Sequence, residues 1–248
     1  MLELSLDTTV DLTRSAVRHG CGAFETLRIT QGKPWRLDLH LERLAAGCAF
    51  LGLAAPPECL VVADFLNKLA VGTSLETGVL RLLAADGRLI VYAEPLASAP
   101  EPVALGLSCE TVRFSGNLLT RFKTLSYLEN LQLTREAARR GLFEVLAPNE
   151  QGYLTDGGRT TVFVVQKDRV LTSPVAAGAL PGIARRVLLE AGYASEAPLR
   201  WEDLIQAEAV FLANALRGVL PVQEIEGQGR RNPEHPAISK ARRLLEEK

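Results

Sequence analysis

The sequence is poor in the side chains that most often bind transition metals. Its 248 residues include three histidines and four cysteines. No C-x-x-C pair occurs, and the histidines do not have the short spacing that zinc sites use. We therefore expect no metal site, and we interpret the isolated cysteines as small buried residues. The residues concerned are His19, His40 and His235, together with Cys21, Cys48, Cys59 and Cys109.

The chain also lacks long apolar runs and a strong net charge. No run approaches the roughly 20 apolar residues of a membrane span. The opening residues, MLELSLDTTVDLTRS, contain acids before any basic residue and no apolar signal-peptide core. The formal net charge is −1, without a polybasic run, which disfavours nucleic acid as the main partner. We expect a cytoplasmic protein that binds neither membranes nor nucleic acid and that acts on a small molecule.

Apolar residues make up 47% of the chain and charged residues 23%, which predicts a packed core. Short apolar strands alternate with amphipathic helices along its whole length, a pattern typical of the α/β class. A helix that begins at Asp38 carries an apolar stripe, with His40 and Arg43 off that stripe. We predict a small N-terminal domain over residues 1–114, a linker over 115–121 and a larger C-terminal domain over 122–248.

Lys123 opens the most informative stretch, RFKTLSYLENLQLTREAARRGLFEVL. The residues after it fit an amphipathic helix whose buried face contains Tyr127, Leu131, Thr134 and Ala138. A lysine held in a cavity at the start of such a helix is desolvated, and desolvation favours the neutral, nucleophilic amine. A single lysine before a helix is otherwise most often a surface residue.

The run K-T-L-S-Y-L-E-N from Lys123 resembles the cofactor-lysine segment of the fold-type IV pyridoxal-phosphate enzymes. This group includes branched-chain and D-amino-acid aminotransferases and 4-amino-4-deoxychorismate lyase. The runs F-E-T-L-R from Phe24 and H-L-E-R-L from His40 resemble two further motifs of the family. The resemblance implies a two-domain α/β fold with the cofactor between the domains, a homodimer, and pyridoxal 5'-phosphate bound covalently by Lys123.

Several cofactor contacts follow from the same resemblance. Arg43 would bind the cofactor phosphate, to which a guanidinium is well matched. Asp156 stands where a glutamate usually pairs with the pyridine nitrogen. In L-P-G-I-A-R the backbone of Ile183 and Ala184, at a helix start, would bind the phosphate. The turn at Ala215 would close the phosphate site from a third side.

Substrate contacts are expected from Arg28 and Arg81, two candidate partners for a carboxylate, and from Thr26, which would help Lys123 to position the substrate. Five motif positions depart from the family pattern. These are Cys21, Asp86, Asp156, Thr161 and Ala184.

Three functions remain open on this basis. The run N-A-L-R-G-V-L-P-V from Asn214 resembles aminodeoxychorismate lyase more than an aminotransferase, so we expect a lyase that releases pyruvate and p-aminobenzoate, a reaction of folate biosynthesis. The alternatives are a class IV aminotransferase for branched-chain or D-amino acids, and a pyridoxal-phosphate-binding homologue with weakened or no catalysis.

Overall fold

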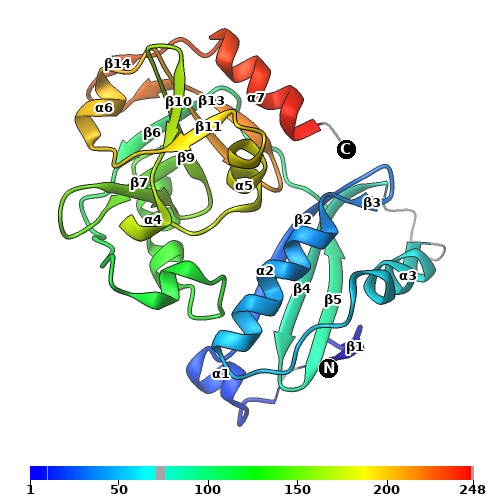
Figure 1. Ribbon diagram of the computed structural model, residues 1–248. Helices are drawn as coiled ribbons and strands as arrows, with labels where there is room; N and C mark the ends of the chain where they lie inside the picture. Colours follow the sequence, from blue (N-terminus) through cyan, green and yellow to red (C-terminus); the bar gives the residue numbers. More distant parts are fainter. Residues whose placement is uncertain (10, 71–75, 247–248) are drawn as a thin grey trace. The chain divides into compact units, whose positions relative to one another are not determined.

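The computed structural model describes residues 1–9, 11–70 and 76–246, and its chain forms two compact units (Figure 1). Unit 1 contains Met1–Ser98 and Phe122–Tyr127, and unit 2 contains Ala99–Arg121 and Leu128–Lys248. The six-residue segment Phe122–Tyr127, which contains Lys123, therefore belongs to unit 1 although the residues on either side of it belong to unit 2. Among the described residues, no helix combines the length and apolar content needed to cross a bilayer.

Unit 1 is a five-stranded sheet with the order β1-β5-β4-β2-β3. Helix α2 packs lengthwise on one face of this sheet, as Figure 1 shows. The elements are β1 (Glu3–Ser5), α1 (Ser15–His19), β2 (Ala23–Thr30), β3 (Lys33–Pro34), α2 (Leu37–Phe50), α3 (Cys59–Ala70), β4 (Thr77–Ala85) and β5 (Arg88–Glu94). The β4–β5 turn needs positive φ angles, and Asp86 (φ 49°) and Gly87 (φ 82°) supply them.

The alternation of side chains along its strands determines which residues form the core of unit 1. Leu27 on β2 and Leu82 on β4 point to the covered face, where they meet Leu41 and Leu44 of α2. Because side chains alternate along a strand, the residues between them point to the other face. Residues 24, 26 and 28 of β2 therefore share a face with Arg81, which lies opposite Thr26 in the register.

Unit 2 is built on a nine-stranded mixed sheet with the order β11-β10-β9-β12-β13-β6-β7-β8, and β14 pairs with β13. Its strands are β6 (Val103–Leu107), β7 (Glu144–Pro148), β8 (Leu154–Gly157), β9 (Thr161–Gln166), β10 (Arg169–Thr172), β11 (Ala194–Glu196), β12 (Ala209–Asn214), β13 (Gly218–Ile225) and β14 (Gly229–Arg230). Its helices are η1 (Leu118–Arg121), α4 (Leu128–Arg139), η2 (Val175–Ala177), α5 (Ile183–Glu190), α6 (Trp201–Ile205) and α7 (Pro236–Glu246). Apolar residues of β9, β12 and β13 supply much of its buried core.

The two units divide the chain before the predicted linker at 115–121. Strand β6 pairs with β7 and with β13, so residues from Ala99 onward belong to unit 2. The segment with Lys123 belongs instead to unit 1, because its backbone pairs with β2. The fold is the two-domain α/β architecture that the resemblance implied.

Two local predictions were wrong. On α4 the buried residues include Leu133 and Ala137, whereas Leu131 is exposed, so the helix is rotated from the predicted face. His40, expected off the buried stripe of α2, is fully buried. It is buried because a glutamate on the covered face of the sheet, Glu25, reaches its ring.

Candidate active site

The backbone around Lys123 is fixed against the start of β2. The Phe24 N–H donates to the Lys123 carbonyl (2.9 Å), and the Leu125 N–H donates to the Gly22 carbonyl (2.8 Å). A Cβ added to Gly22 would lie 2.6 Å from a methyl carbon of Leu125 and 3.0 Å from the Ala84 carbonyl oxygen. Glycine is thus needed at this position for the lysine segment to approach so closely.

The amine of Lys123 lies between two aromatic rings. Its Nζ is 4.2 Å from the ring centroid of Phe24 and 4.4 Å from that of Tyr127. The Tyr127 hydroxyl accepts a hydrogen bond from Nζ at 3.1 Å. The two rings meet edge to face, with centroids 5.1 Å apart. These contacts hold the amine in a defined direction.

Arg43 is held by a buried acid from β2. The Glu25 carboxylate accepts hydrogen bonds from Nε of Arg43 (2.7 Å) and from its Nη2 (2.8 Å). It also accepts one from Nδ1 of His40 (2.6 Å). Burial alone would raise the pKa of Glu25, but its contacts with Arg43 and His40 lower that pKa to about 2. Burial lowers the pKa of His40, so Glu25 is ionised and His40 is neutral near pH 7.

The other face of the unit 1 sheet carries the predicted substrate residues. Arg81 donates through Nε to Glu94 (2.8 Å) and through Nη1 to the Thr26 hydroxyl (3.3 Å). The charge of Arg81 is therefore already compensated. Arg28 lies over the Trp35 ring at 6.0 Å, and its buried Nε makes no hydrogen bond within the described part of the chain. Arg28 is accordingly the better placed of the two arginines to bind an added carboxylate.

In unit 2 the Asp156 carboxylate contacts the segment that leads into α5. Its Oδ2 accepts a hydrogen bond from the Leu180 N–H at 2.9 Å. Two residues later, Gly182 lies against Thr161, because an added Cβ there would be 3.1 Å from the threonine hydroxyl. Helix α5 starts at Ile183 without a side-chain cap. The start of this helix therefore presents backbone N–H groups that suit an anion.

The turn around Ala215 connects β12 to β13. The side-chain oxygen of Asn214 accepts hydrogen bonds from the N–H groups of Leu216 (3.0 Å) and Arg217 (2.8 Å). In the ladder of unit 2, Thr161 is opposite Ala213, directly before this turn. The structure thus gathers the turn, Thr161 and the start of α5 in one region of unit 2.

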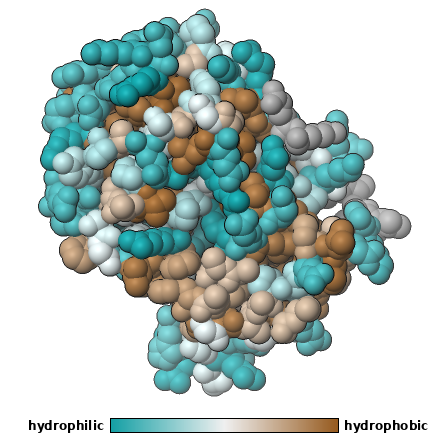
Figure 2. All heavy atoms as spheres, viewed as in Figure 1, coloured by the Kyte–Doolittle hydropathy of each residue, from teal (hydrophilic) through white to brown (hydrophobic). Residues whose placement is uncertain are grey.

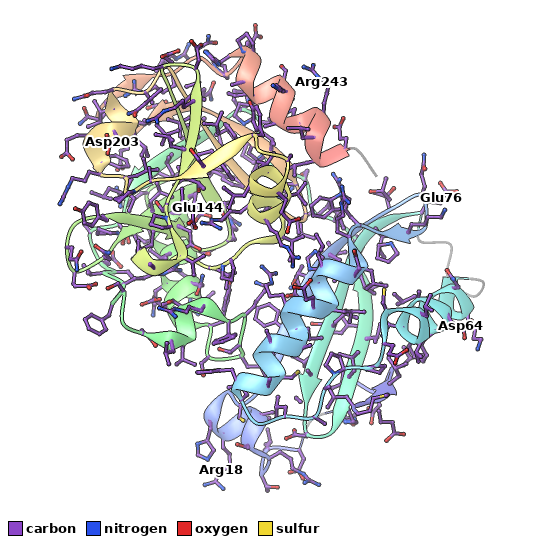
Figure 3. All side chains as sticks on the ribbon, viewed as in Figure 1. Arg18, Asp64, Glu76, Glu144, Asp203 and Arg243 are labelled. Carbon is purple, nitrogen blue, oxygen red and sulfur yellow. The ribbon has the colours of Figure 1, made fainter. Side chains whose placement is uncertain are left out.

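Glu144 supports the loop that follows Asp156. It is fully buried on β7, and Figure 3 shows it inside unit 2. Its oxygens accept hydrogen bonds from the N–H groups of Gly158 (3.1 Å) and Arg159 (3.2 Å) and from the Thr160 hydroxyl (2.9 Å). Burial raises the pKa of Glu144. This acid fixes the backbone between Asp156 and Thr161, which makes it a structural residue.

The sequence did not point to Glu25, Tyr127 or Arg113 as functional residues. Glu25 belongs to the F-E-T motif, but its contact with Arg43 depends on the packing of α2 against the sheet, which the motif does not show. Tyr127 follows Lys123 by four residues, which is the signal that could have identified it. Arg113 is buried in unit 2, in ionic contact with Asp156, and no motif marks it.

The model of the family "Amino-transferase class IV" matches residues 22–225. A D-alanine aminotransferase of Bacillus licheniformis is 24% identical over 90% of this chain and 85% of its own length. A bifunctional aminodeoxychorismate lyase / D-amino acid transaminase of Mycobacterium tuberculosis is 28% identical over 90% of this chain and 86% of its own.

A solved structure shows the same fold over nearly the whole chain. It is that of a Legionella pneumophila protein provisionally assigned as a 4-amino-4-deoxychorismate lyase, with a TM-score of 0.88 and 23% identity. The match covers 98% of each chain. Because the family model covers most of the sequence, this chain belongs to the class IV aminotransferase family of pyridoxal-phosphate-dependent enzymes.

Proposed function

We propose that this protein is a 4-amino-4-deoxychorismate lyase that releases pyruvate and p-aminobenzoate, and that Lys123 is its cofactor lysine. Pyridoxal 5'-phosphate needs an amine, cationic and backbone donors for its phosphate, and a carboxylate for its ring nitrogen. In this proposal, Lys123 of unit 1 would supply the amine and Arg43 a cationic phosphate donor. In unit 2, the start of α5 would supply backbone donors and Asp156 the carboxylate.

The phosphate donors in this proposal are Arg43, the backbone N–H groups of Ile183 and Ala184, and that of Ala215. Arg43 keeps its cationic charge beside Glu25, and the contact with that carboxylate raises its pKa despite burial. Asn214 already uses the amides of Leu216 and Arg217, so Ala215 is the turn residue whose amide these two bonds do not occupy. Ala184 offers no hydroxyl, which leaves the backbone as the donor at that position.

The observation that carries the lyase proposal is the turn after β12. Its sequence, from Asn214 to Val222, resembles the corresponding run of aminodeoxychorismate lyase, and the Asn214 side chain holds it closed.

When bound, the cofactor withdraws electrons from the substrate carbon that carries the amino group. Lys123 accepts the proton of that carbon at Nζ, and Thr26 and Arg28 orient the substrate. The bond between the ring and the enolpyruvyl oxygen then breaks, and the ring becomes aromatic. Lys123 returns its proton to the methylene carbon of the departing group, which completes pyruvate. The proton taken and the proton returned balance.

Pyruvate release tests this proposal. The protein is loaded with pyridoxal 5'-phosphate, 4-amino-4-deoxychorismate is added without a keto acid, and pyruvate is measured with a coupled lactate dehydrogenase. We expect pyruvate and p-aminobenzoate in equal amounts from wild type and none from Lys123→Ala. The lyase proposal is rejected if pyruvate appears only when a keto-acid acceptor is supplied.

An aminotransferase is the second candidate, and the similarity to the D-alanine aminotransferase and to the bifunctional transaminase favours it. The same Lys123 would serve it. Amino transfer from D-alanine to a keto acid, with no turnover of 4-amino-4-deoxychorismate, would establish this function instead. If Lys123→Ala changed neither cofactor binding nor any turnover, the chain would be a homologue without this catalysis.

We also propose that the protein is a homodimer. Apolar side chains appear on the surface in Figure 2. Six large exposed ones belong to unit 2 and lie between positions 112 and 131 of the sequence: Val112, Phe114, Leu118, Leu119, Leu128 and Leu131. Large exposed apolar side chains that form a contiguous patch are typical of an interface. Light scattering should give twice the chain mass for wild type and for Leu60→Arg, an exposed leucine of α3, but the mass of one chain for Leu128→Arg.

A further inference from the structure

Arg113 is a buried arginine with a fixed backbone. Its side chain is 2% exposed. The Arg113 N–H donates to the Pro148 carbonyl at 2.9 Å, and the residue forms a parallel bridge with Asn149 at the end of β7. A guanidinium that is removed from water needs carboxylate partners, because an uncompensated buried charge costs several kcal/mol.

Two carboxylates from different elements contact this guanidinium. Nη1 of Arg113 forms an ion pair with Oδ1 of Asp156, which is itself 5% exposed. Nε of Arg113 is 3.1 Å from Oε2 of Glu129, in the first turn of α4. Because the Leu180 N–H donates to the other oxygen of Asp156, both oxygens of that carboxylate are fixed. The direction of Asp156 is therefore determined by Arg113 and Leu180.

The charges of these groups have a consequence for a cation near Asp156. Arg113 and Asp156 together are neutral, and a neutral pair attracts a cation weakly. Glu129 adds a negative charge, so the three groups carry −1 and can balance one positive charge. A further acid on the neighbouring strand β7, Glu144, accepts hydrogen bonds from the loop from Gly158 to Thr160. The partly exposed Glu129 thus decides how much negative charge Asp156 can offer.

We propose that Arg113 and Glu129 are positioning residues for Asp156, and that they set how firmly the cofactor ring nitrogen stays protonated. This inference rests on the proposed function, in which Asp156 pairs with that nitrogen. Arg113 fixes the shorter carboxylate, one methylene less than the usual glutamate. Glu129 restores the negative charge that Arg113 neutralises. A protonated ring is the stronger electron acceptor, so both residues act on turnover through Asp156.

The test uses Glu129→Gln, which removes the charge from a side chain that is 37% exposed. Wild type and variant are loaded with pyridoxal 5'-phosphate labelled with ¹⁵N in the ring, and the ¹⁵N chemical shift is followed against pH. Glu110→Gln is the matched control, because Glu110 pairs with the exposed Arg139 in the same unit. We expect the cofactor ring nitrogen in Glu129→Gln to lose its proton at a pH about one unit lower than in wild type and in the control.

A second measurement needs no cofactor. The unfolding equilibrium in urea is measured for Glu129→Gln, Asp156→Asn and the double variant of the apoprotein. Glu129 and Asp156 both contact the Arg113 guanidinium. We therefore expect the change in the unfolding equilibrium constant of the double variant to differ at least threefold from the product of the changes in the two single variants. If the two single effects simply multiply, Glu129 and Asp156 are not coupled through Arg113, and the inference is overturned.

The outcomes separate the inference from the proposed function. If wild type binds the cofactor and Glu129→Gln titrates like wild type, the inference is wrong and the proposed function stands. If wild type binds no cofactor, both are wrong.

Discussion

Glu25 and Arg43 form a buried ion pair in which both oxygens of the carboxylate meet the guanidinium, at 2.7 and 2.8 Å. The acid comes from β2 and the arginine from α2, so the pair fastens the helix to the sheet. It also fixes the arginine that we propose as the phosphate ligand. The same contact thus serves the stability of unit 1 and the direction of a binding residue.

The Glu25–Arg43 pair predicts a loss of stability in acid. The pKa of Glu25 is about 2 in the folded chain, below its ordinary value of 4.5. A lowered carboxyl pKa stabilises the fold above the ordinary value, and this contribution disappears as the pH falls from about 4.5 to 2. Burial lowers the pKa of His40 below its ordinary value of 6.5. Below about pH 6.5 the unfolded chain therefore binds a proton at His40 that the folded chain does not, which adds to the loss of stability in acid.

Glu25→Gln should therefore lower the free energy of unfolding at pH 7 by about 3 kcal/mol, the equivalent of the shift in pKa. Its stability should depend less on pH below 4.5 than that of wild type. Urea unfolding between pH 3 and 7 measures both effects, with Glu110→Gln as the surface control. Equal slopes in wild type and Glu25→Gln would show that the pair does not govern acid stability.

Tyr127→Phe tests the hydroxyl beside Lys123, the proposed cofactor lysine. The variant keeps the aromatic contact with Phe24 and loses the 3.1 Å hydrogen bond to Lys123. We expect the absorbance band of lysine-bound cofactor to remain and kcat to fall about tenfold, as for one lost hydrogen bond to a charged group. Lys123→Ala should lose the band altogether.

Tyr193→Phe is the matched control for that change. It also removes a hydroxyl hydrogen bond, to the Ala237 carbonyl, but in unit 2 between α5 and α7. It should lower thermal stability and leave kcat near wild type. A Tyr127→Phe enzyme with wild-type kcat would mean that the tyrosine contributes only packing.

Ala184→Thr restores a hydroxyl at the start of α5. One additional hydrogen bond contributes about 0.5–1.5 kcal/mol, so the dissociation constant of pyridoxal 5'-phosphate should fall by roughly threefold to tenfold. Equilibrium dialysis of the apoprotein measures this constant. Ala191→Thr, beyond the last turn of the same helix, should change nothing. Because Ala184 is buried, a melting curve must first show that the variant is folded.

Arg28→Met should weaken substrate binding more than Arg81→Met. The charge of Arg81 is compensated by Glu94, whereas Arg28 has a buried Nε without a hydrogen bond among the described residues. Loss of a charged contact predicts that KM rises by roughly tenfold to a hundredfold in Arg28→Met. Initial rates of pyruvate release give KM. The reverse order of the two variants would assign the substrate carboxylate to Arg81.

Much of the local structure could be predicted because it depends on short-range rules. The apolar stripe of the helix from Asp38 comprises Leu37, Leu41, Leu44, Cys48 and Leu51. The first four are buried and Leu51 is partly buried, so the period predicted the buried side of α2. The hairpin turns at Asp86-Gly87 and Lys167-Asp168 have positive φ angles, which glycine and aspartate accept more readily than most residues. The predicted face of α4 was wrong because Leu131 and Leu133 are both apolar, and the sequence does not say which side meets the sheet.

By itself the sequence determined the family and the start of α5, and it singled out Lys123 as the proposed cofactor lysine, because these reside in contiguous motifs. Only the tertiary structure decided the partners of buried charges. The pairs of Glu25 with Arg43, and of Arg113 with Asp156 and Glu129, join residues that lie 16 to 43 positions apart. A charge removed from water must find an opposite charge, and the packing of strands and helices determines which residue supplies it.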